Sequence, residues 1–310
     1  MQRYPGLRRD ALKSRKNRRI TMSLQSVLFR TICTFADAAR DKGLRTPPDI
    51  RRIDNIPYGP EGAWNTLDIY RPKSVPEKLP VLVSVHGGGY VYGSTKQYQF
   101  YCMNLAQKGF AVVSFNYRLA PEYKFPAPLE DLNQVMWWIA DKAGIYGLDT
   151  ERAALVGDSA GAQIASQYAA VCTNPEYAEV MGIFPPSVKI CALGLNCGMY
   201  DLKAQALHEE MNGLKKSDYF GTDPQQFGEK LNVLDAVTPV YPPAYLLSSG
   251  GDFLRDKCEP MAEFLRKKGI PCEYKIYGDE NTGHVFHLNI RSELAERAND
   301  DEIRFIKKYL

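Results

Sequence analysis

The chain has 310 residues, of which 45% are hydrophobic and 24% are charged, and it carries a formal net charge of +3 at pH 7. This composition is ordinary for a soluble globular protein, and no apolar run approaches the roughly 18 residues that a membrane-spanning helix needs. The seven cysteines, an odd number without a Cys-x-x-Cys pair, argue against a disulfide framework and favour a reducing, cytoplasmic location.

The first 21 residues form a basic leader. Residues 1–19 contain eight Lys or Arg against one acidic residue, Asp10, so the rest of the chain carries a net charge of −4. Such a tract suits nucleic acid or an anionic membrane, but a flexible, solvated leader is the simpler interpretation, and we expect no nucleic-acid partner. The leader lacks the apolar segment of a secretory signal. Its composition is compatible with a transit peptide, and Met22 is an alternative first residue.

The first predicted elements are a helix and two strands. A helix over 22–42, inside the segment 22–45, ends at Gly43. Strands are predicted over 50–58 and 64–70, joined by Gly and Pro residues. The apolar residues of the helix fall on one face: Leu24, Val27, Leu28, Ile32 and Phe35.

Beyond residue 80, apolar strands alternate with helices. This pattern predicts an α/β fold, with a mostly parallel eight-stranded sheet flanked by helices on both faces. The further strands are predicted at 81–85, 111–115, 153–156, 190–195, 245–249 and 273–277. The helices are predicted at 97–108, 129–142, directly after residue 160, around 261–265 and at 292–309.

One interval is too long for an ordinary connection. About fifty residues separate the strand at 190–195 from the next strand, and they include a polar stretch of helical character at 203–216. Long insertions of this kind often build lids. We therefore predict that 201–243 and the N-terminal helix form a small helical cap. The core of the fold then consists of 46–200 and 244–310.

The motif Gly157–Gly161, with sequence Gly-Asp-Ser-Ala-Gly, follows the strand at 153–156 and precedes a helical segment. A serine between two glycines at a strand-to-helix turn has the layout of a nucleophile elbow. The turn pushes the hydroxyl of Ser159 outward and leaves it beside helix N–H groups that suit an oxyanion. A bare match also arises by chance, and the alternative is an ordinary glycine-rich turn.

A serine nucleophile needs a base, and histidine suits that role because its pKa lies near neutrality. In one common triad order, the acid and then the histidine follow the serine along the chain. His284, preceded by Gly283, is the preferred base, and His287 is the alternative. His208 precedes every plausible acid, and His86 is assigned to ordering its own loop.

The acid is expected at the end of the strand before the last. Asp252 stands there, after Gly250 and Gly251, where a carboxylate can orient the imidazole and stabilise its charged form. Asp256 is the runner-up, but its place at the start of the following helix suits a capping role.

The oxyanion donors are expected in the loop after the strand at 81–85, where three glycines follow a histidine. Gly88 and Gly89, together with Ala160, are the predicted N–H donors. Phosphate-binding patterns such as G-x-G-x-x-G are absent from the sequence. Tyr90 and Tyr92 flank this loop, and we expect them either to line the substrate pocket or to serve in packing.

Two further stretches are Asn-Tyr-Arg-Leu-Ala-Pro-Glu at 116–122 and Phe-Pro-Ala-Pro-Leu-Glu-Asp at 125–131. Together with the glycine turn, the serine motif and the two candidate triad partners, they resemble the hormone-sensitive-lipase-like branch of the α/β-hydrolases, the HGGG-type carboxylesterases. The likeness covers about residues 50–310. In that family the glycine turn supplies the oxyanion hole, G-D-S-A-G carries the nucleophile, and a D-x-L-R-D run, here 252–256, begins with the triad acid. The family's H-G-F appears at 284–286 as His-Val-Phe, so the glycine is replaced. The family's cap is built from N-terminal helices and an insertion after the sixth strand.

The resemblance implies a serine carboxylesterase that acts on short- to medium-chain acyl esters through an acyl-enzyme. Amide, formamide or acetyl-sugar ester hydrolysis on the same triad is an alternative, as is a non-catalytic small-molecule-binding protein. No cofactor is expected. No metal is expected either, because His284 and His287 lack further ligands at sensible spacing. The expected partner is a small-molecule ester, and a homo-oligomer is compatible with the sequence.

Overall fold

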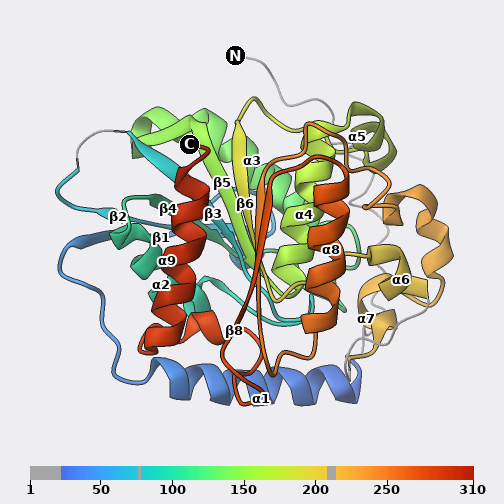
Figure 1. Cartoon of the computed structure of the whole chain (residues 1–310), viewed down its shortest axis with the longest axis horizontal. Helices are drawn as coiled ribbons and strands as arrows, with labels where there is room; N and C mark the ends of the chain where they lie inside the picture. Colours follow the sequence, from blue (N-terminus) through green and yellow to red (C-terminus); the bar gives the residue numbers. More distant parts are fainter. Residues whose placement is uncertain (1–21, 76–77, 208–213) are drawn as a thin grey trace.

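The computed structural model of the chain describes residues 22–75, 78–207 and 214–310. The basic leader and His208 lie outside the described residues. Eight strands form one sheet in the order β1-β2-β4-β3-β5-β6-β7-β8 (Figure 1). The strands are β1 (Ile50–Pro57), β2 (Thr66–Pro72), β3 (Leu79–Val85), β4 (Ala111–Phe115), β5 (Leu148–Asp158), β6 (Ile190–Asn196), β7 (Ala244–Ser249) and β8 (Cys272–Tyr277).

The sheet is mostly parallel. Strand β2 pairs antiparallel with both β1 and β4, and every pairing from β4 to β8 is parallel. The central strands are buried on both faces, as the consecutive residues Val81, Leu82 and Val83 show with 0% exposure each. Because the parallel strands all end at one edge, the loops that follow them meet there. The predicted α/β class and the eight strands are confirmed.

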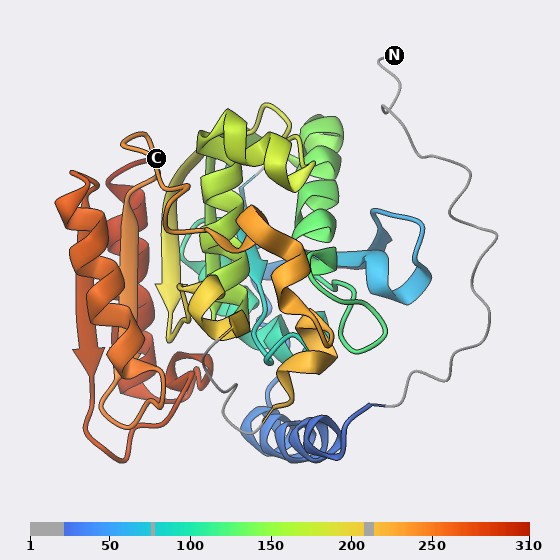
Figure 2. The same ribbon diagram turned by 90° about the vertical axis from the view of Figure 1, so that its right-hand side faces the viewer.

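Helices cover both faces of the sheet (Figures 1 and 2). Helices α3, α4 and α8 pack into one apolar core, and α2 and α9 pack into the other. The helices are α1 (Leu24–Asp41), α2 (Thr95–Gln107), α3 (Ala127–Tyr146), α4 (Ala160–Thr173), α5 (Pro175–Met181), α6 (Leu202–Leu207), α7 (Lys216–Phe220), α8 (Arg255–Lys267) and α9 (Glu293–Lys307). Short 3-10 turns are η2 (Gly62–Asn65), η3 (Pro224–Leu231) and η4 (Phe286–Leu288).

The insertion differs from its predicted form. Instead of one helix over 203–216, α6 ends at Leu207, and residues 208–213 lie outside the described ranges. Lys215 is extended, with φ −82° and ψ 108°, so α7 begins as a separate helix after it. Tertiary contacts position α7, because Asp218 in its first turn accepts hydrogen bonds from α1. The sequence patterns predicted neither α5 nor η3.

Helix α1 lies across the carboxyl ends of the strands, at one end of the molecule (Figures 1 and 2). The hydroxyls of Ser23 and Ser26 donate to Asp218 over 2.6 and 2.7 Å, which ties α1 to α7. The helix forms where the sequence predicts it, but its apolar residues face solvent: Leu24 is 80% exposed and Phe35 is 73% exposed. In the described ranges, no helix combines the length and the apolar character needed to cross a bilayer.

Candidate active site

Ser159 occupies a sharp turn between β5 and α4. Its backbone has φ 52° and ψ −118°, a conformation that is costly for a residue with a side chain. A Cβ atom at Gly157 would lie 2.5 Å from the carbonyl oxygen of Gly161, and one at Gly161 would lie 2.0 Å from that of Val85. Both positions therefore require glycine, which gives the spacing of the motif a steric cause.

Asp252 and His284 come from the loops after β7 and β8 and form a hydrogen-bonded pair. Nδ1 of His284 lies 2.7 Å from Oδ1 of Asp252. The carboxylate also accepts hydrogen bonds from the Ser248 hydroxyl, at 2.8 Å, and the Leu254 amide, at 2.9 Å. Burial raises the pKa of Asp252, but the hydrogen bond and charge of His284 and these other donors outweigh it and hold the pKa at about 2. The carboxylate is therefore ionised at neutral pH and can orient the imidazole.

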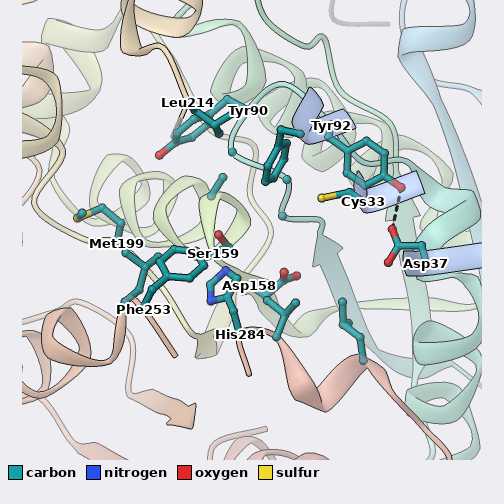
Figure 3. Close-up of a pocket in the computed structure, with 18 of the residues that line it drawn as sticks. Cys33, Asp37, Tyr90, Tyr92, Asp158, Ser159, Met199, Leu214, Phe253 and His284 are labelled. Carbon is teal, nitrogen blue, oxygen red and sulfur yellow. Dashed lines mark hydrogen bonds between the residues drawn. The ribbon is translucent and has the colours of Figure 1, made fainter. Parts of the chain in front are cut away.

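The structure brings Ser159, Asp252 and His284 together at one edge of the sheet. Ser159 and His284 line the same pocket, and the imidazole lies next to the serine (Figure 3). The runner-up residues lie elsewhere. The side chain of Asp256 is 88% exposed on α8. His287 is 0% exposed and packs edge-on against Tyr101, and burial lowers its pKa to about 3.

The loop after β3 is a tight glycine turn beside Ser159. Gly88 and Gly89 have φ values of 108° and 58°, and a Cβ atom on Gly88 would lie 2.2 Å from the carbonyl oxygen of Tyr92. Among the described residues, no protein acceptor takes a hydrogen bond from the N–H of Gly88 or Gly89. Ala160, the first residue of α4, lines the pocket with them, and its N–H belongs to the first turn of a helix, where amides lack intrahelical partners.

A tyrosine ties this loop to the serine turn. The hydroxyl of Tyr98, on α2, accepts from the Gly87 amide and donates to Oδ2 of Asp158, each over 2.8 Å. His86 stacks on Tyr117 with ring centroids 4.0 Å apart, and its Nδ1 lies 2.8 Å from the Gly87 carbonyl oxygen. Burial lowers the pKa of His86 to about 4, so its contacts agree with an ordering role. Nothing in the sequence distinguishes Tyr98 from other residues of its helix.

Tyr90 and Tyr92 border the pocket and also pack against its walls. Tyr90 is 1% exposed and stacks on Tyr219 at 3.8 Å, with its hydroxyl 3.2 Å from the amide oxygen of Gln205. The hydroxyl of Tyr92 donates to Asp37 of α1 over 2.8 Å (Figure 3). The two predicted roles, pocket lining and packing, are therefore combined in both residues.

The pocket has a volume of about 330 Å³, and Ser159 is one of the residues that line it. The N-terminal helix and the insertion both contribute to its walls, as do the loops after β6, β7 and β8. Outside the glycine turn and the serine motif, the lining residues to which the sequence assigned no role are Phe29, Cys33, Ala36, Asp37, Tyr98, Met199, Gln205, Leu214, Phe253, Leu254, Val285 and Leu288. Most of them lie in segments predicted as the cap or the site loops. Phe253, Leu254 and Val285 fall inside the motifs at 252–256 and 284–286, but those motifs give them no role of their own.

One cluster has the composition of a metal site. In the described part of the chain, ligand atoms of Cys197, Asp252 and His284 lie within 4.8 Å of one another. Burial raises the pKa of the Cys197 thiol well above its usual value, and a protonated thiol is a poor ligand. Since Asp252 and His284 already bind each other, we interpret the cluster as this pair with a neighbouring thiol.

Comparison with known proteins supports a hydrolase fold and an esterase family. A family model of the alpha/beta hydrolase fold matches residues 82–288. Esterase LipI of Mycobacterium tuberculosis is 32% identical over 263 residues, which cover 81% of this chain and 80% of LipI.

Two solved esterases have the same fold. Esterase B of Lactobacillus rhamnosis aligns with a TM-score of 0.83 at 22% identity, over 92% of this chain and 94% of its own. The Pyrobaculum calidifontis esterase aligns with a TM-score of 0.73 at 26% identity, over 94% of each chain. The chain therefore belongs to the α/β-hydrolase family, in its hormone-sensitive-lipase-like branch of carboxylic ester hydrolases.

Proposed function

We propose that the protein is a serine carboxylesterase that hydrolyses short- to medium-chain acyl esters of small alcohols through an acyl-enzyme. The observation that carries this proposal is the Asp252–His284 hydrogen bond of 2.7 Å in a pocket that also contains Ser159. A nucleophile, a base and an orienting carboxylate are the three groups that acyl transfer to serine needs.

In the proposed reaction, His284 removes the proton of Ser159 as the serine oxygen attacks the ester carbonyl. Asp252, ionised at neutral pH, stabilises the imidazolium that forms. The tetrahedral intermediate collapses, the bond to the alcohol oxygen breaks, and His284 returns the proton to the alcohol. Water then attacks the acyl carbon while His284 takes its proton. The bond to the Ser159 oxygen breaks as His284 returns the proton to that oxygen, and the carboxylic acid leaves.

The oxyanion is proposed to bind the N–H groups of Gly88, Gly89 and Ala160. Amides that are fixed before the reaction stabilise the developing charge without reorganisation, and each is worth about 3 kcal/mol in the transition state. The positive φ of both glycines and the hydrogen bond from Gly87 to Tyr98 hold this turn in place.

The pocket supports a small substrate. Its volume of about 330 Å³ is at the low end of the roughly 300–1,000 Å³ of small-molecule sites, and Phe29, Met199 and Leu214 give it apolar walls. We expect a series of p-nitrophenyl esters to show the highest kcat/KM for short and medium acyl chains. A maximum beyond about ten carbons would contradict this size limit.

A fluorophosphonate probe tests the nucleophile directly, since it forms a covalent bond with an activated serine. We expect the wild type to be labelled and Ser159→Ala to be unlabelled. Ser292→Ala, which removes the N-cap serine of α9, is the matched control and should be labelled like the wild type. An unlabelled wild type would instead favour a binding protein on a hydrolase scaffold.

A further inference from the structure

The amphipathic helix α1 has its two sides reversed relative to an ordinary surface helix. The side turned to solvent, which we call the outer face, is apolar, with exposed fractions between 45% and 80%. Surface helices normally bury this stripe against the core. A contiguous apolar strip on a surface indicates a partner. The apolar residues of the outer face are Leu24, Val27, Leu28, Ile32 and Phe35. The exposed Thr31 lies among them, and its hydroxyl donates to the Val27 carbonyl oxygen within the helix.

The charged residues of α1 lie on its other side and hold it to the protein. Arg30 donates to the carbonyl oxygen of Ala120 over 2.8 Å, and Arg40 donates to that of Gln97 over 2.6 Å. Asp37 accepts from a pocket tyrosine. None of the four charged side chains of this fully described helix is among its exposed residues. Polar contacts therefore attach the inner side of the helix to the protein. The uncharged outer face remains exposed and available to bind a partner.

The residues directly before α1 are strongly basic. Positions 1–19 hold eight Lys or Arg and one acidic residue, a net charge of +7 in the sequence shortly before the helix. An apolar helix face combined with an adjacent basic tract is the combination that binds anionic lipid surfaces, because the face enters the interface while the charges meet the headgroups. We propose that the outer face of α1 and this basic tract dock the enzyme on an anionic lipid surface.

A second copy of the chain fits the outer face less well. Figure 2 shows α1 as a single helix at one end of the molecule. Eighteen helical residues give a strip about 27 Å long and about 10 Å wide, well below the roughly 800 Å² that each partner of a stable complex buries. Self-association would also give the basic tract no partner. A lipid surface needs no shape complementarity and explains both features.

Docking through the outer face of α1 would also place the pocket close to the lipid surface. The inner side of α1 supplies Phe29, Cys33 and Ala36 to the pocket wall, so α1 stands between the lipid surface and Ser159. On the other side of the serine lies Phe253, which is 57% exposed (Figure 3). The docking itself does not depend on the proposed catalytic roles.

Vesicle flotation tests the outer face. The full chain is mixed with vesicles of about three parts phosphatidylcholine to one part phosphatidylserine, and the bound fraction is measured against lipid concentration. We expect Leu28→Gln combined with Phe35→Gln to weaken binding about a hundredfold, because both side chains leave the apolar interface. The matched control, Ile145→Gln with Phe184→Gln, changes residues that are 72% and 63% exposed outside α1. It should bind like the wild type.

The basic tract is tested separately in the full chain. Replacing Arg15, Lys16, Arg18 and Arg19 by glutamine should weaken binding to the anionic vesicles by roughly a hundredfold or more, since each charge near such a surface contributes about 1 kcal/mol. Raising the salt concentration should have the same effect on the wild type and a much smaller effect on this variant. Vesicles of phosphatidylcholine alone should bind the wild type weakly.

Three results would overturn the proposal. The wild type could fail to float with anionic vesicles, or the Leu28 and Phe35 variant could bind as well as the wild type. Light scattering could also show a wild-type dimer that this variant converts to a monomer, with no vesicle binding by either, which would make the outer face a contact between copies. Fluorophosphonate labelling of every variant reports the active site independently, so failure of docking and failure of the proposed chemistry are distinguishable.

Discussion

The serine turn and helix α1 stand on opposite sides of one pocket and are built in opposite ways. At the turn, Gly157 and Gly161 are in such close contact with backbone that no side chain fits. Helix α1 is attached by hydrogen bonds such as those to Asp218, and its other side is largely exposed, with Leu24 at 80% and Phe35 at 73%. The serine turn therefore tolerates only glycine at these two positions. The exposed residues of α1, in contrast, can be replaced without disturbing the core.

This difference predicts different stabilities. The turn belongs to the buried centre of the sheet, whose opening requires global unfolding. A hydrogen bond contributes a net of about 1 kcal/mol, so a helix attached by a few of them opens at a lower free energy than the core. Three substitutions and one change of pH, ordered from the largest expected effect to the smallest, test how far this contrast holds.

Asp252→Asn should have the largest effect. An amide in place of the carboxylate that bonds His284 leaves the geometry similar but no longer favours the imidazolium, and kcat should fall by about four orders of magnitude. Steady-state hydrolysis of p-nitrophenyl acetate measures the change. Asp256→Asn is the matched control, because its side chain is 88% exposed, and it should retain wild-type kcat. The reverse outcome would assign the acid to Asp256.

Gly161→Ala should destabilise the protein by about 3 kcal/mol or more, because its Cβ would meet the carbonyl oxygen of Val85 at 2.0 Å and backbone must move to admit it. Gly144→Ala is the control within α3, where nothing lies within 4 Å of the added atom. It should be neutral or stabilising by up to about 1 kcal/mol. Urea unfolding measures both, and equal losses would show that crowding is not what requires glycine at position 161.

The same contrast explains what could be predicted from the sequence. The serine turn requires glycine at two nearby positions for steric reasons, so it can be recognised in the sequence as the motif at 157–161. The parallel strands end at one edge, so Asp252 and His284 could be expected near Ser159 from strand order alone. The α/β fold followed from alternating apolar runs for the same reason: local patterns determine it.

Other features depend on contacts between distant segments and leave no local pattern. The periodicity of α1 predicts a helix and an apolar face, but not that the face turns to solvent, because the inward direction is set by partners such as Asp218. Tyr98 joins the Gly87 amide to Asp158 across the fold, and its sequence neighbours do not reveal this. The cap boundaries, 22–45 and 201–243, stay a prediction.

Acid should weaken the Asp252–His284 pair with a defined sign. The folded-state pKa of Asp252, about 2, lies below its ordinary value of about 3.9. Its contribution to stability, about 2.6 kcal/mol, is therefore present above pH 4 and lost as the pH falls through about 2. Urea unfolding of the wild type and of Asp252→Asn should show a stability difference that shrinks by about two thirds of this amount between about pH 5 and pH 2.5. A difference that stays constant over that range would contradict the lowered pKa.

The smallest effect is expected at the attachment of α1. Ser26 is fully buried and its hydroxyl donates to Asp218 over 2.7 Å, so Ser26→Ala should weaken the attachment by about 1 kcal/mol. Global stability should change little, because the core opens separately from α1. Amide hydrogen exchange within α1 should accelerate about fivefold. KM should rise a few-fold at unchanged kcat, since α1 lines the pocket without touching the reacting groups.

Thr31→Ala is the control for this attachment. Its hydroxyl is exposed and donates to the Val27 carbonyl oxygen within the same helix over 2.8 Å, so exchange in α1 and KM should match the wild type. If both variants accelerated exchange equally, the helix would be held by its own hydrogen bonds and not by Asp218. If Ser26→Ala lowered global stability by the full 1 kcal/mol instead, α1 would unfold with the core. The serine turn and the helix would then differ in their place in the fold but not in their stability.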